Sequence, residues 1–332
     1  MQKYAYNKIL ALTIISLSVL CFAPFIGMHI LLPINVAHDS LQRQIFFSLR
    51  LPRTITAFLA GGGLALCGVV LQAMFRNPLA EPFTLGISSG AAFGAALTIL
   101  LGLPSILPGI PMVSFGALCG ALTAIALVYG FSKIHRYTDS HSMLLSGIVV
   151  SFFFSSAMMF AQYVSNFRDS FYIVRWLMGG IETFGYSQIF ILLFFIVIGS
   201  IIISWKLPEI DLLLTGDDIA QSRGVNIART KALLLFAVTL IAGSIVAQCG
   251  PIGFIGLIVP FIARSFFTIN HKVLGPVAFM LGGIFLVFCD TFSRTIFSPV
   301  EIPVGVITSM IGAPFFLWLL LSKRTNTQRG IF

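Results

Sequence analysis

Residues 9–32 read ILALTIISLSVLCFAPFIGMHILL, a run that contains no Lys, Arg, Asp or Glu. A helix that crosses a bilayer needs about 20 apolar residues, whereas a strand of a membrane barrel needs only about 9–11 with alternating polarity. The run is therefore too long for a strand. Because backbone N–H and C=O groups in lipid must be paired within their own segment, it predicts an α-helical membrane protein.

The composition of the whole chain agrees with this interpretation. Of the 332 residues, 58% are hydrophobic and only 9% are charged, whereas soluble domains carry roughly 25% charged residues. So few charges cannot cover a soluble globule, which excludes a cytosolic enzyme, a secreted disulfide scaffold and a disordered tail. The five cysteines lie inside apolar runs without a CxxC pair, so neither a disulfide framework nor a metal site is predicted.

The apolar runs predict ten membrane helices in a single domain that covers residues 1–332. The expected ranges are 9–32, 54–75, 84–102, 111–131, 142–163, 187–206, 229–249, 252–268, 273–297 and 303–321. The run 252–268 is short and interrupted by Gly and Pro, so it is expected to cross only part of the bilayer.

The distribution of basic residues predicts that both termini lie in the cytoplasm. With that orientation, fourteen Lys and Arg residues fall on inside segments and six Arg residues fall outside, as membrane topology favours. The net charge of +9 is scattered over the ends of apolar runs and forms no stripe, so nucleic acid is not a predicted partner. The outside residues are Arg43, Arg50, Arg53, Arg168, Arg175 and Arg294. The first three share one expected loop, and this excess requires a functional explanation.

Two segments depart from the alternation of helix and short loop. Residues 207–228 form the longest inside segment, with Asp217 and Asp218 suited to a helix N-terminus and Gly224 suited to a helix end. A short amphipathic helix outside the bilayer is predicted there, with a plain solvated loop as the alternative. Residues 164–186 carry interfacial aromatic side chains and are expected to lie along the outer membrane surface.

Glycines spaced four residues apart predict close helix packing. They occur in Gly86-x3-Gly90-x3-Gly94 and in Gly116-x3-Gly120. Small residues at this spacing let two helix backbones approach each other closely in lipid.

The chemistry of an energy-coupled enzyme or carrier is missing. No G-x4-G-K-[ST] phosphate loop occurs, so ATP is not expected to bind to this chain. No His, Asp or Glu cluster suggests a membrane-embedded enzyme, and no catalytic residue is assigned. Ion-coupled carriers need acidic groups within the membrane, and the main candidate is Asp290, which lies four residues before Arg294 and is expected to pair with it. These features favour a pore subunit that a partner drives.

Several blocks carry a resemblance to a known family. They are RLPRTITAFLAGGGLALCGVVLQAMFRNPLAEPFTLGISSGAAFG from Arg50, WLMGG from Trp176, CGPIGFIGLIVPFIAR from Cys249, DTFSR from Asp290 and EIPVGVITSMIGAPFFLWLL from Glu301. With the segment 211–224, they cover nearly the whole chain. The sequence resembles the permease subunits of ABC importers for iron–siderophore complexes, haem and cobalamin, often called the FecCD family.

The resemblance implies the type II ABC importer permease architecture, with about ten transmembrane helices. It implies a homodimer with the substrate path at the subunit interface, two cytoplasmic ATP-binding subunits and one periplasmic or lipid-anchored substrate-binding protein. ATP and Mg²⁺ would bind to the ATPase subunits, so this chain is expected to be a transporter subunit without a cofactor or catalytic role. The expected location is the bacterial inner membrane.

The resemblance also assigns roles to particular residues. Arg50, Arg53 and Arg294 match the residues that meet acidic groups of the binding protein. The helix that couples the permease to the ATPase matches 211–224 and includes Leu213, Leu214, Thr215, Gly216, Asp217, Ala220, Arg223 and Gly224. The cytoplasmic gate matches Leu79 and Ser140. Relatives commonly have His where this chain has Phe261, which predicts altered packing there.

The expected substrate is a bulky metal chelate, with an iron–siderophore complex or haem preferred. Cobalamin and an oxyanion such as molybdate remain alternatives within the same architecture. An ion-coupled secondary carrier is the more distant alternative.

Overall fold

Seven helices are long and apolar enough to cross a membrane in the part of the chain that the computed structural model describes. This part comprises residues 2–27, 31, 33–104, 111–134, 140–182, 185–267, 271–298 and 300–327. Three helices with shorter apolar segments bring the number to the predicted ten. No β-strand occurs in these ranges. The fold is therefore the all-α polytopic membrane fold that the apolar runs predict.

Apart from the first helix, the ten helices begin and end within about six residues of the ranges that the apolar runs predict. The seven long ones are α1 (Gln2–Phe22), α4 (Leu51–Phe75), α6 (Met112–Ile134), α7 (Ser140–Val164), α9 (Ser187–Trp205), α12 (Ile227–Cys249) and α14 (His271–Thr295). The three with shorter apolar segments are α5 (Ile87–Leu100), α13 (Ile255–Phe266) and α15 (Val304–Thr327). The connecting elements are η1 (Ala23–Phe25), α2 (Pro33–His38), α3 (Ser40–Ile45), η2 (Phe46–Arg50), η3 (Pro82–Leu85), α8 (Phe167–Leu177), α10 (Leu207–Leu214) and α11 (Asp217–Ser222).

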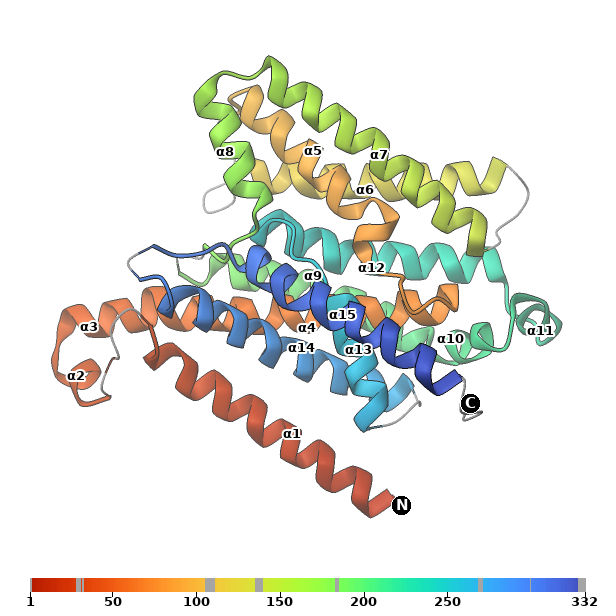
Figure 1. The fold of residues 1–332 in the computed structure, drawn as a ribbon, viewed down its shortest axis with the longest axis horizontal. Helices are drawn as coiled ribbons and strands as arrows, with labels where there is room; N and C mark the ends of the chain where they lie inside the picture. Colours follow the sequence, from red (N-terminus) through yellow and green to blue (C-terminus); the bar gives the residue numbers. More distant parts are fainter. Residues whose placement is uncertain are drawn as a thin grey trace.

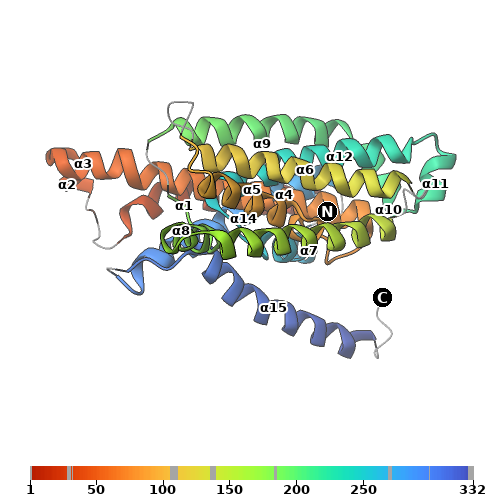
Figure 2. The same cartoon turned by 90° about the horizontal axis from the view of Figure 1, so that it is seen from above.

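Helix α4 forms the centre of the bundle (Figure 1). It is buried along most of its length and packs against α14, α13, α12 and α9. Helices α5, α6 and α7 form a neighbouring group that reaches the centre mainly through the contact between α6 and α12. Helices α4, α6 and α12 run nearly parallel, α1 and α7 are inclined to them (Figure 1), and α15 diverges from the bundle (Figure 2). The start of α1 and the end of α15 lie toward the end of the bundle that carries α10 and α11 (Figure 1).

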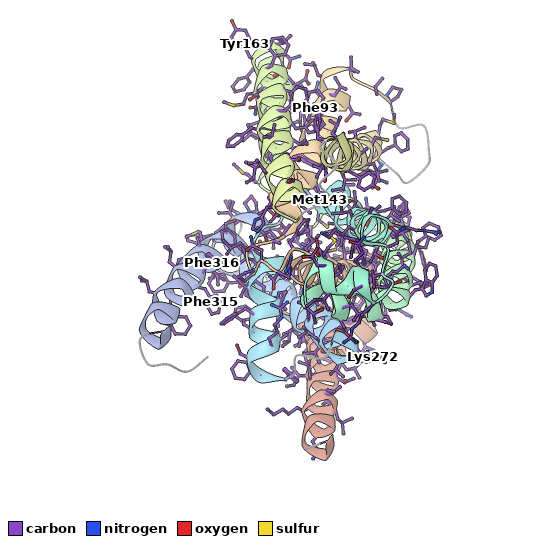
Figure 3. All side chains as sticks on the ribbon, turned by 90° about the vertical axis from the view of Figure 1, so that its right-hand side faces the viewer. Phe93, Met143, Tyr163, Lys272, Phe315 and Phe316 are labelled. Carbon is purple, nitrogen blue, oxygen red and sulfur yellow. The ribbon has the colours of Figure 1, made fainter. Side chains whose placement is uncertain are left out.

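Apolar side chains cover the outside of this bundle, as expected for a surface that faces lipid or other subunits. Seen from the end that carries α10 and α11, Tyr163 of α7 stands at one edge, and Phe315 and Phe316 of α15 stand at another (Figure 3). The outward side of α7 exposes Phe152, Phe153 and Phe160 among others.

The first helix is shorter than predicted. The sequence predicts one helix over 9–32, but α1 ends at Phe22 and is followed by the 3-10 turn η1. Pro24 lies in the first turn of η1, and Ile26 has extended backbone angles of φ −93° and ψ 127°. A proline restricts the residue before it and cannot donate a helical hydrogen bond. The α-helix therefore ends ten residues before the apolar run does, and the described residues directly after it are the 3-10 turn Ala23–Phe25 and the extended Ile26.

The expected loop that contains Arg43, Arg50 and Arg53 is helical instead. Helices α3, η2 and α4 follow one another without a break from Ser40 to Phe75. Pro52 lies inside this continuous helix without an N–H, and two carbonyls of the preceding turn accept from other donors: Phe47 O from the hydroxyl of Tyr186 at 2.9 Å, and Ser48 O from the N–H of Gly185 at 3.1 Å. The three arginines therefore sit on a continuous helix rather than on a loop, and the helical backbone determines their directions.

The predicted glycine packing is confirmed between α5 and α6. A Cβ atom placed on Gly90 would lie 2.4 Å from the carbonyl oxygen of Gly120, and one on Gly94 would lie 2.1 Å from that of Gly116. A side chain of any size would collide with these carbonyl oxygens. The two helix backbones are therefore in direct contact, as small residues at this spacing permit.

Helix α13 begins only at Ile255, which agrees with the prediction that this run crosses part of the bilayer. Its internal Pro260 has no N–H, so the carbonyl of Gly256 lacks its helical donor. The Nε2 atom of Gln72 on α4 donates to that carbonyl at 3.1 Å, while Arg264 Nη1 donates to Gln72 Oε1 at 2.6 Å. Gln72 thus compensates for the proline. Phe261 is half-buried on the same helix, and its effect on packing stays a prediction.

Replacing Gln72 with leucine is expected to destabilise the protein by about 1–3 kcal/mol, because the buried carbonyl of Gly256 and the guanidinium of Arg264 both lose a hydrogen bond. The midpoint of thermal unfolding in detergent measures the effect. Gln72→Glu separates the two hydrogen bonds, since glutamate still accepts from Arg264 but cannot donate to the carbonyl of Gly256. An unfolding midpoint equal to wild type for Gln72→Leu would show that these bonds do not hold α13 to α4.

Candidate functional site: ion pairs at both ends of the bundle

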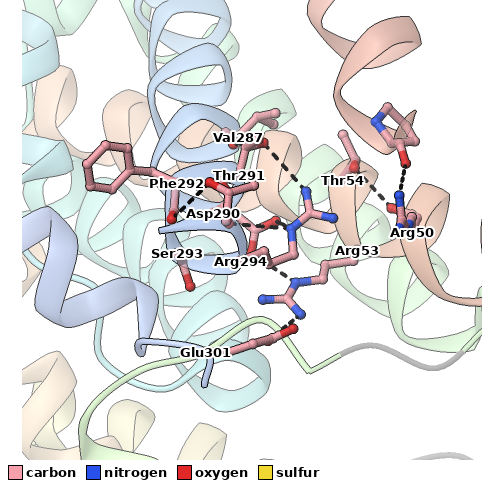
Figure 4. A network of polar contacts seen from close by, with 12 residues as sticks. Arg50, Arg53, Thr54, Val287, Asp290, Thr291, Phe292, Ser293, Arg294 and Glu301 are labelled. Carbon is pink, nitrogen blue, oxygen red and sulfur yellow. Dashed lines mark hydrogen bonds and ion pairs between the residues drawn. The ribbon is translucent and has the colours of Figure 1, made fainter. Parts of the chain in front are cut away.

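A buried carboxylate lies between two arginines near the end of the bundle that carries α8 (Figure 4). Asp290, near the end of α14, has no exposed surface. Its Oδ1 lies 2.9 Å from Nε of Arg53 on α4, and its Oδ2 lies 3.1 Å from Nε of Arg294, one turn further along α14. The predicted pair of Asp290 and Arg294 is therefore confirmed, and Arg53 joins it from another helix.

A second carboxylate completes the charge balance. Nη1 of Arg53 lies 2.8 Å from Oε2 of Glu301, in the segment just before α15. The side chain of Arg53 is 17% exposed and that of Glu301 is 53% exposed, whereas that of Arg294 is only 6% exposed. Two arginines thus face two carboxylates, and this cluster (Arg53, Asp290, Arg294 and Glu301) carries no net charge. The role of Glu301 was not predicted, although its position directly before an apolar run was a signal.

Arg50 lies apart from the cluster and makes different contacts. Its Nη1 atom donates to the backbone carbonyls of Pro24 and Phe25 at 3.4 and 3.2 Å. It therefore ties the start of the α4 region to η1, at the point where the first apolar run leaves the helix. Of the three arginines expected to dock a binding protein, Arg53 and Arg294 are brought together and Arg50 holds a neighbouring turn. The docking role itself stays a prediction.

A cavity of about 940 Å³ opens beside the cluster, with Arg53 and Glu301 in its wall. Tyr172 and Trp176 of α8 and Gln248 near the end of α12 also line it. Helix α8 begins where the side chain of Asn166 accepts a hydrogen bond from the N–H of Asp169 at 2.9 Å, which gives this surface helix a defined start. The walls thus combine aromatic, amide and ionic groups.

At the opposite end, the segment predicted as one helix over 211–224 forms two. Helix α10 ends at Leu214 and α11 begins at Asp217. The break occurs at Gly216, whose φ of +121° is accessible to glycine and strained for other residues. A helix does occur there, so the alternative of a plain loop is wrong for this segment.

Apart from the partly exposed Asp217, the residues expected to couple to an ATPase divide into two groups. Leu213 and Ala220 are fully buried and hold the segment to the bundle. Those that leave surface for a partner are Leu214, Thr215, Gly216, Arg223 and Gly224. The burial pattern allows contact with a partner, and the coupling role stays a prediction.

Asp217 anchors this segment to two long helices. Its Oδ2 lies 2.6 Å from Nζ of Lys231 on α12, and the lysine side chain has no exposed surface. Its Oδ1 lies 3.9 Å from Nη2 of Arg76, which ends α4 with a left-handed φ of 50°. Sequence reasoning missed Lys231, although a lysine just inside an apolar run near two aspartates was an available signal.

The two expected gate residues lie next to helix ends, one just after α4 and one at the start of α7. The N–H of Leu79 donates to Asn77 Oδ1 at 2.9 Å, which fixes the turn after α4. Leu79 is exposed, and it lines a cavity of about 430 Å³ together with Phe83 and residues of α7. Ser140 is the first residue of α7. The gate role of both residues stays a prediction.

Within the described ranges, no three His, Cys, Asp or Glu residues gather in a way that could hold a metal ion. The chemistry of the two ends is therefore that of ion pairs and hydrogen bonds. Such groups can bind charged surfaces and transmit movement between helices.

Comparisons with known proteins agree with this architecture. Residues 9–322 match the FecCD transport family. The cobalamin import system permease protein BtuC of Halobacterium salinarum is 37% identical, covering 89% of this chain and 78% of its own length. The hemin transport system permease protein HmuU of Yersinia pestis is 34% identical, covering 87% of each chain. The uncharacterized ABC transporter permease protein YvrB of Bacillus subtilis is 36% identical, covering 86% of this chain and 81% of its own length.

A solved structure is similar over almost the whole chain. It is an inward-facing conformation of a proposed metal-chelate type ABC transporter, with a TM-score of 0.84 and 30% identity, covering 96% of this chain and 99% of that one. The family match extends over residues 9–322, a range that contains both groups of ion pairs, and the relatives cover most of the chain. The chain therefore belongs to the FecCD transport family and is an ABC transporter permease.

Proposed function

We propose that this chain is the membrane subunit of a binding-protein-dependent importer that moves a bulky metal chelate, an iron–siderophore complex or haem, across the bacterial inner membrane. ATP hydrolysis on two separate cytoplasmic subunits drives the transport, so this chain is not itself an enzyme. Cobalamin is the second candidate substrate, because relatives named for haem and for cobalamin are similarly identical to this chain. An oxyanion such as molybdate would use the same architecture.

The observation that carries this proposal is the pair of polar regions at opposite ends of one apolar bundle. At one end, α10 and α11 lie beyond the long helices and present surface for a driving subunit (Figure 1). At the other end, Arg53 lies at the surface beside the large cavity. The start of α1 and the end of α15 lie toward α10 and α11, which supports a cytoplasmic location for both termini.

A homodimer is part of the proposal. The exposed apolar side chains on α7 and the cavity that Leu79 lines support an interface with a second copy at this face. A path between two subunits would be lined by aliphatic and aromatic groups, which suit a bulky chelate because they do not trap it by charge.

The contacts of Asp290 argue against an ion-coupled carrier. A carrier needs an acidic group that can bind and release the coupling ion. Asp290 is fully buried between Arg53 and Arg294, within 3.1 Å of both. The carboxylate of Asp290 therefore lies against two guanidinium groups and is not open to a coupling ion.

Native mass spectrometry tests the proposed assembly. The tagged chain is co-expressed with the genes that neighbour it and purified in mild detergent. We expect a complex of two copies of this chain with two copies of a P-loop ATPase. Recovery of a lone monomer or dimer, with the ATPase expressed but never bound, would contradict the importer.

A further inference from the structure

The cluster of Arg53, Asp290, Arg294 and Glu301 carries no net charge, although its two arginines are expected to receive an acidic partner. Arg53 and Arg294 are matched by Asp290 and Glu301, with each ion pair at 2.8–3.1 Å. A carboxylate that approaches from solvent therefore meets an arginine that already has a carboxylate. A partner carboxylate can take the positions that these two acids hold on Arg53 only if one of them gives way.

The two acids differ in how easily they can leave. Asp290 has no exposed surface and is held by two arginines, so its departure would bury uncompensated charge. Glu301 is 53% exposed and has one ion pair, to Nη1 of Arg53. Exposed pairs are worth only about 0.2–1 kcal/mol, because water solvates the separated groups well. Glu301 is thus the acid that can be displaced.

The backbone around Glu301 is fixed, so the displacement concerns its side chain alone. The hydroxyl of Ser293 donates to the carbonyl of Ile302. The N–H of Gly305 donates to the carbonyl of Gly179 at 3.2 Å. Rotation of the Glu301 side chain into solvent would leave these contacts in place and would open Nη1 of Arg53.

We propose, resting on the importer function proposed for this chain, that Glu301 occupies the site on Arg53 that a carboxylate of the docked substrate-binding protein takes. The partner group is an Asp or Glu side chain, which can accept from a guanidinium with the same geometry as Glu301. Arg294 keeps its ion pair with Asp290 in this arrangement, and the competition concerns Arg53. Glu301 therefore competes with the binding protein for Arg53 and limits the affinity of docking.

The test measures the affinity of the purified permease–ATPase complex for the substrate-binding protein encoded beside it. Glu301→Gln keeps the shape of the side chain and its acceptor oxygen but removes the charge. It is expected to tighten binding by about three- to fivefold at low salt, and by less at high salt because screening weakens the competition. Glu182→Gln is the matched control: Glu182 pairs with Arg175 at 2.8 Å in the wall of the same cavity, and its replacement is expected to leave the affinity unchanged.

Arg53→Gln separates this proposal from the docking function on which it rests. Arg53→Gln is expected to weaken docking and to abolish the gain from Glu301→Gln in the double variant. If Arg53→Gln leaves docking unchanged, the docking role is wrong. If Arg53→Gln weakens docking but Glu301→Gln binds no tighter than wild type, docking stands and the competition is overturned. An equal gain in Glu182→Gln would also overturn it, because the effect would then be one of general surface charge.

Discussion

Asp290→Asn is expected to lower the midpoint of thermal unfolding in detergent by about 5–10 °C, one of the two largest effects predicted for this chain. Asp290 is fully buried, and Arg294 beside it is 6% exposed. Removing one partner of a buried ion pair costs about 3–5 kcal/mol, because the remaining charge has lost its solvent without compensation. Asparagine matches aspartate in size, so the loss comes from the charge.

The double variant Asp290→Asn with Arg294→Met separates charge from packing. It removes the buried guanidinium together with its carboxylate, so it is expected to recover much of the lost stability. Glu182→Gln, which breaks the exposed pair with Arg175, is expected to change the midpoint by about 1 °C or less. If Asp290→Asn unfolds like wild type, other groups neutralise the two arginines and Asp290 is not the centre of the cluster.

The pair of Asp290 and Arg294 could be predicted because it is local. Residues four apart on a helix lie on the same face, and the spacing alone brings the two groups together. The contact of Arg53 with Asp290 spans 237 positions and depends on how α4 packs against α14. Composition and periodicity carry no information about that register.

The helix breaks show the same limit. Hydropathy predicts where a chain is apolar, and it therefore extended the first helix to residue 32, although α1 ends at Phe22. Pro24 was visible in the sequence, yet prolines also lie inside α13, α14 and α15. Whether a proline ends a helix depends on whether another group satisfies the freed carbonyl, as Gln72 does for Gly256. Such contacts join residues far apart in the chain, so local sequence patterns do not predict them.

The segment at 211–224 was predicted as helical because its acidic start and glycine end are local signals. Its division at Gly216 and its attachment to Lys231 were not predicted, because the first depends on a backbone angle and the second on the packing of α12. The docking, coupling and gate residues came from the resemblance to the family. The structure shows which of the described residues among them are buried and which are exposed.

Asp217→Asn is expected to release α11 from the bundle. Its effect on stability is the second of the two largest that we predict. Lys231 is fully buried, and its ammonium lies 2.6 Å from the carboxylate of Asp217. Loss of that carboxylate is expected to cost about 2–4 kcal/mol, somewhat less than for a fully buried pair because water reaches part of Asp217. Hydrogen exchange of the backbone amides in 217–226 and the midpoint of thermal unfolding measure the release. Asp218→Asn is the matched control, because Asp218 is the exposed neighbour of the same type.

Lys231→Met in the Asp217→Asn background distinguishes anchoring from stability. The double variant removes the buried charge and is expected to recover the thermal midpoint, but it cannot restore the ion pair, so hydrogen exchange in 217–226 should stay fast. In the complex with the ATPase, a segment that moves without α12 and α4 transmits less of its movement to the membrane helices. ATP hydrolysis should therefore continue in both variants, while uptake per ATP falls. If exchange in Asp217→Asn matches that of Asp218→Asn, the buried apolar contacts of Leu213 and Ala220 hold the segment, and the ion pair does not anchor it.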